Sequence, residues 1–175
     1  YKTLHEIGIE NKNVKVTADP ALDLDIADEK LGKAILKNEG VPSDKKLLGV
    51  SVRKWQNLGS DFETQIANAC DYAYEKYGYY TVFLPMQSSR DTAIMQNIKR
   101  KMKHESAIIK KRYSVEGMLS IIKCFDMCIG MRLHTLIYAA INSVPLIGLV
   151  YDPKINSFME YTHQRHYVDV NEVTD

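Results

Sequence analysis

Short apolar segments alternate with longer amphipathic segments along most of this chain, and this alternation limits its fold more than any other feature. Four apolar runs are continuous and rich in β-branched or aromatic residues, at 47–52, 79–85, 126–130 and 145–151. Strands have this composition when both faces of their sheet are covered, as in parallel sheets. The intervening segments carry apolar residues at helical spacing and are joined by short connections. The sequence therefore predicts an α/β fold with a doubly wound, Rossmann-like parallel sheet.

The predicted helices and strands follow one another in strict order. Helices are expected at 1–9, 28–38, 60–78, 88–102, 114–125, 133–142 and 156–162, and strands at 14–17, 47–52, 79–85, 107–112, 126–130, 145–151 and 166–170. Ser60 and Glu63 have the spacing of a capping box, and Ser114 is a second predicted helix cap. The helix after Ser60 is expected to bury one stripe of side chains, formed by Phe62, Ile66, Ala69, Cys70, Ala73 and Tyr77. No GxGxxG motif follows the first strand, so the dinucleotide-binding fingerprint is absent.

Composition argues against several classes of function. The formal net charge is only +1, whereas nucleic-acid-binding domains usually have a strongly basic surface. The three cysteines lack the spacing of a metal site or a disulfide framework, which favours a reduced cytoplasmic setting. No apolar run approaches the roughly 18 residues that a membrane span needs. We therefore expect a cytoplasmic protein that binds no nucleic acid or metal and is not transmembrane, with a position at the inner face of the membrane left open.

Polar residues follow four of the predicted strands. In open α/β sheets, ligands bind beyond the carboxyl ends of the strands, which meet at one edge. The residues at these ends are Arg53, Gln87, the turn from Gly130 to His134, and the turn from Tyr151 to Lys154. We therefore predict a single crevice that contains Arg53, Gln87, Arg132, His134 and Lys154.

Arg132 and His134 carry most of the chemistry expected in this crevice. An arginine can hold a carboxylate or phosphate bidentately. A histidine in the first turn of a helix lies where free N–H groups and the helix dipole attract anions. Each residue also has a plainer explanation: Arg132 as a surface arginine paired with Asp126, and His134 as a capped histidine of the core.

The remaining crevice residues have plainer explanations too. Lys154 would be a solvated lysine and Arg53 would pack over Trp55, while Gln87 and Asp91 would be ordinary groups of a loop and a helix start. The case for a site depends on the shared direction of the strands rather than on any one of these residues.

The segment GMRLHTLIYAAINSVPLIGLVYDPKINSF, at 130–158, resembles the polysaccharide pyruvyl transferase family, in particular the bacterial branch that modifies secondary cell-wall polymers. Three further stretches agree with the family in the same order: VTADPAL at 16–22, LGVSVRKW at 48–55 and LPMQSSRD at 84–91. The resemblance covers nearly the whole chain. The RLH triplet alone is common, but its combination with the other segments is specific.

The resemblance implies a two-domain enzyme similar to GT-B glycosyltransferases, with two Rossmann-like domains. Residues 19–175 would be its C-terminal catalytic domain, residues 1–18 the end of the preceding segment, and the N-terminal domain would be absent from this chain. The family transfers the pyruvyl group of phosphoenolpyruvate to a sugar as a ketal and releases phosphate. The acceptor is commonly N-acetylmannosamine of a cell-wall polymer precursor, whether lipid-linked or not. No cofactor is implied beyond phosphoenolpyruvate as the donor substrate.

The resemblance also implies roles for individual residues. Arg132 and His134 would serve phosphoenolpyruvate binding and catalysis, and Lys154 would belong to the donor site. Gly130, Leu133, Arg53 and Gln87 complete the predicted substrate-binding set. Two alternatives stay open: a GT-B-type glycosyltransferase or sugar-nucleotide epimerase, and a non-catalytic domain that binds glycan or protein through the tyrosine-rich segment at 72–80.

Overall fold

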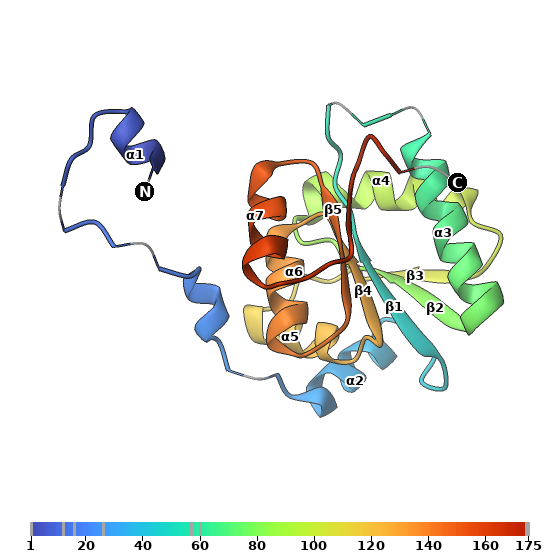
Figure 1. Ribbon diagram of the computed structural model, residues 1–175. Coiled ribbons are helices and arrows are strands. Elements are labelled where there is room, and N and C mark those ends of the chain that lie inside the picture. Colours follow the sequence, from blue (N-terminus) through green and yellow to red (C-terminus); the bar gives the residue numbers. More distant parts are fainter. Residues whose placement is uncertain are drawn as a thin grey trace.

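Six parallel strands form the middle layer of the fold, which is shown by a computed structural model (Figure 1). The strands are β1 (Lys46–Ser51), β2 (Tyr79–Phe83), β3 (Ser106–Ile108), β4 (Met127–Gly130), β5 (Leu146–Val150) and β6 (Tyr167–Asp169). They lie in the order β3-β2-β1-β4-β5-β6, and every neighbouring pair is parallel. The prediction of a doubly wound parallel sheet is therefore confirmed.

The structure describes residues 2–11, 13–15, 17–25, 27–56, 58–59 and 61–173. The helices are α1 (Lys2–Glu6), α2 (Glu29–Asn38), α3 (Phe62–Tyr77), α4 (Ser88–Lys101), α5 (Val115–Lys123), α6 (Leu133–Ile141) and α7 (Pro153–Tyr161), with a 3-10 turn, η1 (Pro20–Asp23), before α2. No helix within the described ranges is long and apolar enough to span a membrane.

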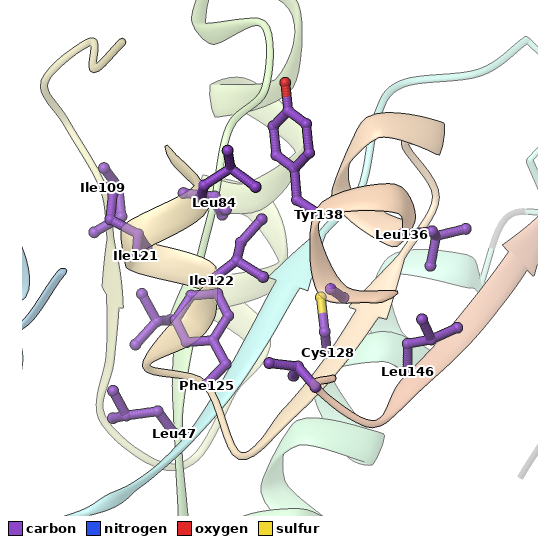
Figure 2. Close-up of a cluster of buried hydrophobic side chains, with 14 of the residues drawn as sticks. Leu47, Leu84, Ile109, Ile121, Ile122, Phe125, Cys128, Leu136, Tyr138 and Leu146 are labelled. Atoms are coloured by element: carbon purple, nitrogen blue, oxygen red, sulfur yellow. The ribbon is translucent and has the colours of Figure 1, made fainter. Parts of the chain in front are cut away.

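The helices cover both faces of the sheet. Helices α3 and α4 pack together on one face, and α2, α5, α6 and α7 cover the other (Figure 1). The cluster under the second group includes Phe125, Cys128, Leu136 and Tyr138, and Tyr138 points its hydroxyl away from the other labelled side chains (Figure 2). The strands are apolar on both faces because both faces are buried.

The strand order has one switch point, between β1 and β4. Strand β1 continues through α3 to β2 on one side, whereas β4 continues through α6 to β5 on the other. Ser51 and Gly130 are paired at the carboxyl ends of these two strands. The chain therefore leaves the two strands in opposite directions, which opens a crevice between them.

Several predicted boundaries were wrong. No strand includes the described residues at 14, 15 and 17, because this segment lies apart from the sheet (Figure 1) and an isolated strand has no partner for its backbone. Helix α7 begins at Pro153 rather than Asn156, since proline suits the first helical position. Ser60, the predicted cap of α3, lies outside the described residues. The structure gives Asp61 as the N-cap, without a side-chain hydrogen bond.

The buried stripe of α3 also differs from the prediction. Ala69 and Tyr77 are exposed, whereas Ala67 and Asp71 are buried beside Ile66 and Cys70. Successive residues of a helix are rotated by about 100° around its axis. A predicted stripe that is displaced by one residue therefore includes side chains that do not face the sheet. By contrast, Ser114 caps α5 as predicted, because its side chain accepts a hydrogen bond from the Gly117 N–H group.

Candidate functional site

A groove of about 600 Å³ lies at the carboxyl edge of the sheet, beside the switch point. It is lined by Arg53, Met86, Gln87, Arg132, Leu133, His134, Tyr138, Tyr151 and Lys154. The five residues predicted to share a crevice therefore do lie together, and Leu133 lies with them. Their roles remain predictions. Within the described ranges, no three His, Cys, Asp or Glu residues are grouped so that they could hold a metal ion.

Arg132 forms an ion pair with Asp91, a residue of the first turn of α4. The Nε atom of Arg132 lies 3.2 Å from Oδ2 of Asp91, and Nη2 contacts Oδ1. The Asp91 side chain is 0% exposed, and that of Arg132 is 16% exposed. The alternative partner Asp126 was wrong, because the carboxylate of Asp126 accepts a hydrogen bond from the Leu47 N–H group at 2.8 Å. The Arg132 side chain is therefore fixed in the groove wall by Asp91 rather than free at the surface.

Helix α6 begins at this groove without a side-chain cap. Its N-cap is Arg132, which has extended backbone angles and cannot accept a hydrogen bond through its side chain. The first N–H groups of a helix have no acceptor within the helix, and the dipole makes this end positive. Leu133 and His134 occupy these positions. An anion in the groove would therefore meet free backbone donors as well as the cationic side chains.

His134 is exposed at the start of α6. Its ring lies 6.0 Å from the ring of Tyr138, in an edge-on arrangement. The alternative of a core histidine was therefore wrong. Burial, and secondly the charge of Asp19, raise the pKa of the Tyr138 phenol. Tyr138 consequently stays neutral across the physiological range.

Arg53 packs against two aromatic rings, which also contact each other at a centroid distance of 4.8 Å. Its guanidinium carbon lies 5.2 Å from the ring centroid of Trp55 and 5.3 Å from that of Tyr151. Nη1 donates a hydrogen bond to the Tyr151 hydroxyl at 3.3 Å. The expected packing over Trp55 is present, but the same side chain also lines the groove. Stacking on aromatic faces holds an arginine in place while leaving its in-plane N–H groups available to a ligand.

Lys154 lies in the first turn of α7. Its Nζ is 3.6 Å from Oδ2 of Asp152 and 5.5 Å from the ring centroid of Tyr151. Its backbone N–H donates to Oδ1 of Asp152 at 3.0 Å, so α7 has the side-chain cap that α6 lacks. The Lys154 side chain is 48% exposed, and it is free to swing toward a ligand as a flexible point charge.

Gly130 is not among the residues that line the groove, and it is the last residue of β4. A Cβ atom at this position would be 2.6 Å from Cδ2 of Leu136, a buried residue of α6. Gly130 thus allows α6 to approach the end of β4, and its contribution is steric. Gln87 is exposed, and its Oε1 accepts a weak hydrogen bond from Nη2 of Arg132 at 3.4 Å.

The sequence pattern did not indicate the parts that Asp91 and Tyr138 play at the groove, whereas Tyr151 lies in a turn that was predicted to reach it. The plainer explanation of Asp91 as a group of a helix start is correct in part, because its carboxylate accepts a hydrogen bond from the Gln87 N–H group at 2.8 Å. The second partner of this carboxylate, Arg132, is far away in the sequence and is brought close by the pairing of β1 with both β2 and β4. Nothing in the local pattern around Asp91 indicates that contact.

Comparison with known proteins gives a family and a fold. A model of the polysaccharide pyruvyl transferase family matches residues 1–153. None of the curated proteins compared with the chain matches it significantly in sequence.

Similar solved structures include a UDP-GlcNAc 2-epimerase from Methanocaldococcus jannaschii (TM-score 0.67, 17% identity), covering 97% of this chain and 48% of the epimerase. A glycosyl transferase family 9 protein from Veillonella parvula (TM-score 0.61, 14% identity) covers 96% of this chain and 46% of that protein. The Escherichia coli ADP-heptose LPS heptosyltransferase II (TM-score 0.62, 12% identity) covers 81% and 44%. The chain thus spans less than half the length of these proteins, and the likeness shows a shared fold.

Proposed function

Because this chain belongs to the polysaccharide pyruvyl transferase family, we propose that it carries the donor site of an enzyme that transfers the pyruvyl group of phosphoenolpyruvate to a sugar. The observation that carries the proposal is the groove at the switch point, where Arg53, Arg132 and Lys154 surround the uncapped start of α6. Phosphoenolpyruvate is a small molecule that combines a carboxylate with a phosphate. A site for it needs several cations and backbone donors within a short span.

The groove residues suit the two ends of this donor. Arg132 and Arg53 offer planar N–H pairs, which match the geometry of a carboxylate or phosphate oxygen pair. Lys154 offers a mobile point charge, and the N–H groups at the start of α6 offer directed donors. In this proposal the same cations stabilise the phosphate as it leaves, when its charge increases.

The proposed reaction joins two sugar hydroxyls to one donor carbon. A proton adds to the methylene carbon of phosphoenolpyruvate, and C2 becomes electron-deficient. One sugar hydroxyl attacks C2 and loses its proton, and the C2–O bond to phosphate then breaks. The second hydroxyl attacks the same carbon and loses its proton, which closes the ketal ring. One phosphoenolpyruvate and one diol thus give one cyclic ketal and one phosphate.

His134 is the proposed proton carrier of this reaction. Its ring is exposed at the groove, and imidazole exchanges protons near neutral pH. Two roles fit this position: the acid that protonates the methylene carbon, or the base that accepts the proton of an attacking hydroxyl. A bound dianion beside α6 favours the protonated ring, and this would prepare His134 for the acid role.

The rest of the enzyme is proposed from the family resemblance. Residues 19–175 would form the C-terminal catalytic domain, and an N-terminal domain outside this chain would face the groove and bind the glycan. The proposed acceptor is N-acetylmannosamine of a cell-wall polymer precursor, and the proposed location is the cytoplasm or the inner face of the membrane.

The test requires the full-length protein. It is incubated with phosphoenolpyruvate and a synthetic disaccharide that contains N-acetylmannosamine, and phosphate release and product mass are followed. We expect phosphate release that depends on the acceptor, together with a mass increase of one pyruvyl ketal. His134→Ala and Arg132→Lys are expected to lose this activity while remaining folded.

The fold itself suggests the competing outcome, because the similar solved structures include a nucleotide-sugar epimerase and glycosyltransferases. Thermal stabilisation by UDP or ADP, with no turnover of phosphoenolpyruvate on any glycan tested, would refute the pyruvyl transferase proposal. It would indicate instead that the protein binds a nucleoside diphosphate.

A further inference from the structure

Asp91 makes two kinds of contact, and together they fix its position. Oδ2 accepts a hydrogen bond from the Gln87 N–H group at 2.8 Å, which ties the carboxylate to the start of α4. Oδ2 and Oδ1 also accept hydrogen bonds from Nε and Nη2 of Arg132. The side chain is completely buried, and α4 is held by the packing of Ile94, Met95 and Ile98 in the core. Asp91 is therefore a rigid acceptor.

The contact occupies one particular edge of the Arg132 guanidinium. A guanidinium has five N–H groups, arranged in a side edge formed by Nε and one Nη and an end edge formed by the two Nη atoms. Asp91 takes the side edge. Nη1 has no partner among the described residues, and the end edge has only the weak 3.4 Å contact from Nη2 to Gln87. Arg132 lines the groove, so its end edge is the part left for a ligand.

We propose that Asp91 is a positioning residue of the donor site, which holds the side edge of Arg132 so that the end edge faces the groove. This inference rests on the proposed function, and it adds a residue that does not itself touch the donor. An arginine side chain is flexible, and ordering it upon binding costs free energy. Asp91 removes that cost by ordering Arg132 before the donor arrives, and the free edge still offers two parallel N–H groups to a carboxylate or phosphate.

The ion pair between Asp91 and Arg132 also affects where the groove is positively charged. A buried carboxylate against a guanidinium cancels most of the net charge at that point, so Arg132 contributes direction more than attraction. Among the described residues, no buried carboxylate pairs with Arg53 or Lys154. The nearest carboxylate to Lys154, that of Asp152, is partly exposed and lies 3.6 Å from Nζ. Loss of Asp91 should therefore weaken donor binding through lost geometry, even though it leaves the groove more positive.

The experiment compares Asp91→Asn with Asp126→Asn in the full-length protein. Asp126 is the control: it is exposed, but it also accepts a backbone N–H hydrogen bond, from Leu47, and it has no arginine partner among the described residues. Asp91→Asn keeps the size of the side chain and one acceptor, so it should fold. We expect its KM for phosphoenolpyruvate to rise at least tenfold with a smaller fall in kcat, whereas Asp126→Asn should leave KM unchanged.

A spectroscopic measurement tests the contact itself. The Nε–H signal of Arg132 in an arginine-labelled ¹H–¹⁵N spectrum is assigned by its absence in Arg132→Lys. We expect Asp91→Asn to shift this signal and Asp126→Asn to leave it in place. An unchanged signal in Asp91→Asn would overturn the inference, and so would a shifted signal with an unchanged donor KM.

Failure of the proposed function gives a different pattern. If the parent protein turns over no phosphoenolpyruvate, the pyruvyl transferase proposal is refuted. The positioning role then rests on titration of the parent and of Asp91→Asn with inorganic phosphate. Weaker phosphate binding in Asp91→Asn supports the role, and equal binding overturns it.

Discussion

The turns before α6 and α7 follow neighbouring strands at the same edge of the sheet, yet they begin their helices in opposite ways. Helix α7 begins with Asp152 and Pro153, and the Asp152 carboxylate occupies the Lys154 N–H group. Helix α6 begins with Arg132, which offers no acceptor to the first N–H groups. The first N–H groups of α7 have a side-chain acceptor, whereas those of α6 remain available to a bound anion.

This difference indicates where an anion would bind. Two helix dipoles point at the same edge, but at α7 a carboxylate already sits against the positive end. At α6 the Asp91 carboxylate is turned instead to the side edge of Arg132 and to the start of α4. Of these two helices, only α7 has a side-chain cap, and the start of α6 is the one that the proposed donor would use.

Arg132→Ala should have the largest effect on both activity and stability. It should abolish pyruvyl transfer and lower the free energy of unfolding by about 3–5 kcal/mol, because it leaves the buried Asp91 carboxylate without its cation. The double variant Arg132→Met with Asp91→Leu should recover most of the stability but none of the activity. Urea unfolding measures both. Equal stability of Arg132→Ala and the parent would show that the ion pair contributes little.

His134→Ala should separate activity from stability. Loss of a proton carrier typically lowers kcat by about 10²–10⁴-fold, whereas an exposed side chain changes stability by less than about 0.5 kcal/mol. His166→Ala is a suitable control, since His166 is exposed before β6 and does not line the groove. Retention of more than a tenth of the parent kcat by His134→Ala would contradict the proposed role. Steady-state phosphate release measures the difference.

Two glycines allow α6 and α7 to pack closely against β4 and β5. Gly130 and Gly148 are paired across β4 and β5, and a Cβ at either would meet the helix that follows. Gly130→Ala would press on Cδ2 of Leu136 at 2.6 Å, and overpacking of this kind costs about 1–3 kcal/mol. Gly148→Ala would meet Met159, with Sδ at 2.9 Å, and the flexible methionine should yield more easily. Thermal unfolding should therefore rank Gly130→Ala as the less stable, and the reverse order would contradict this.

Asp152→Ala should have the smallest effect. Removal of a helix cap costs about 1 kcal/mol, and the lost carboxylate would free Lys154 to meet the donor. We expect a slightly lower melting temperature and a donor KM that does not rise, opposite in direction to Asp91→Asn. A raised KM in Asp152→Ala would mean that Asp152 holds Lys154 in its working position.

The sequence predicted the fold and the composition of the groove because both follow from repeated local patterns. Parallel strands bring their carboxyl ends to one edge, so Arg53, Gln87, Arg132 and Lys154 had to be near one another. The contacts between these residues and their neighbours were not predictable in the same way. Whether Arg132 pairs with Asp126 or Asp91 depends on which direction the side chain takes from the end of β4, and both aspartates are equally plausible in the sequence. The face of α3 was missed because a rotation of one residue is enough to expose Ala69.

The switch point also bears on how the protein folds. Every other strand pair joins consecutive strands, whereas Leu48 of β1 pairs with Met127 of β4 across two intervening strands and three helices. Closing such a long loop is entropically costly, so contacts of this range tend to form late in folding. Asp91 and Arg132 lie on opposite sides of that junction. A folding intermediate with two separately formed half-sheets would therefore contain every groove residue and still lack the site, and recovery of anion binding during refolding should lag behind recovery of helical structure.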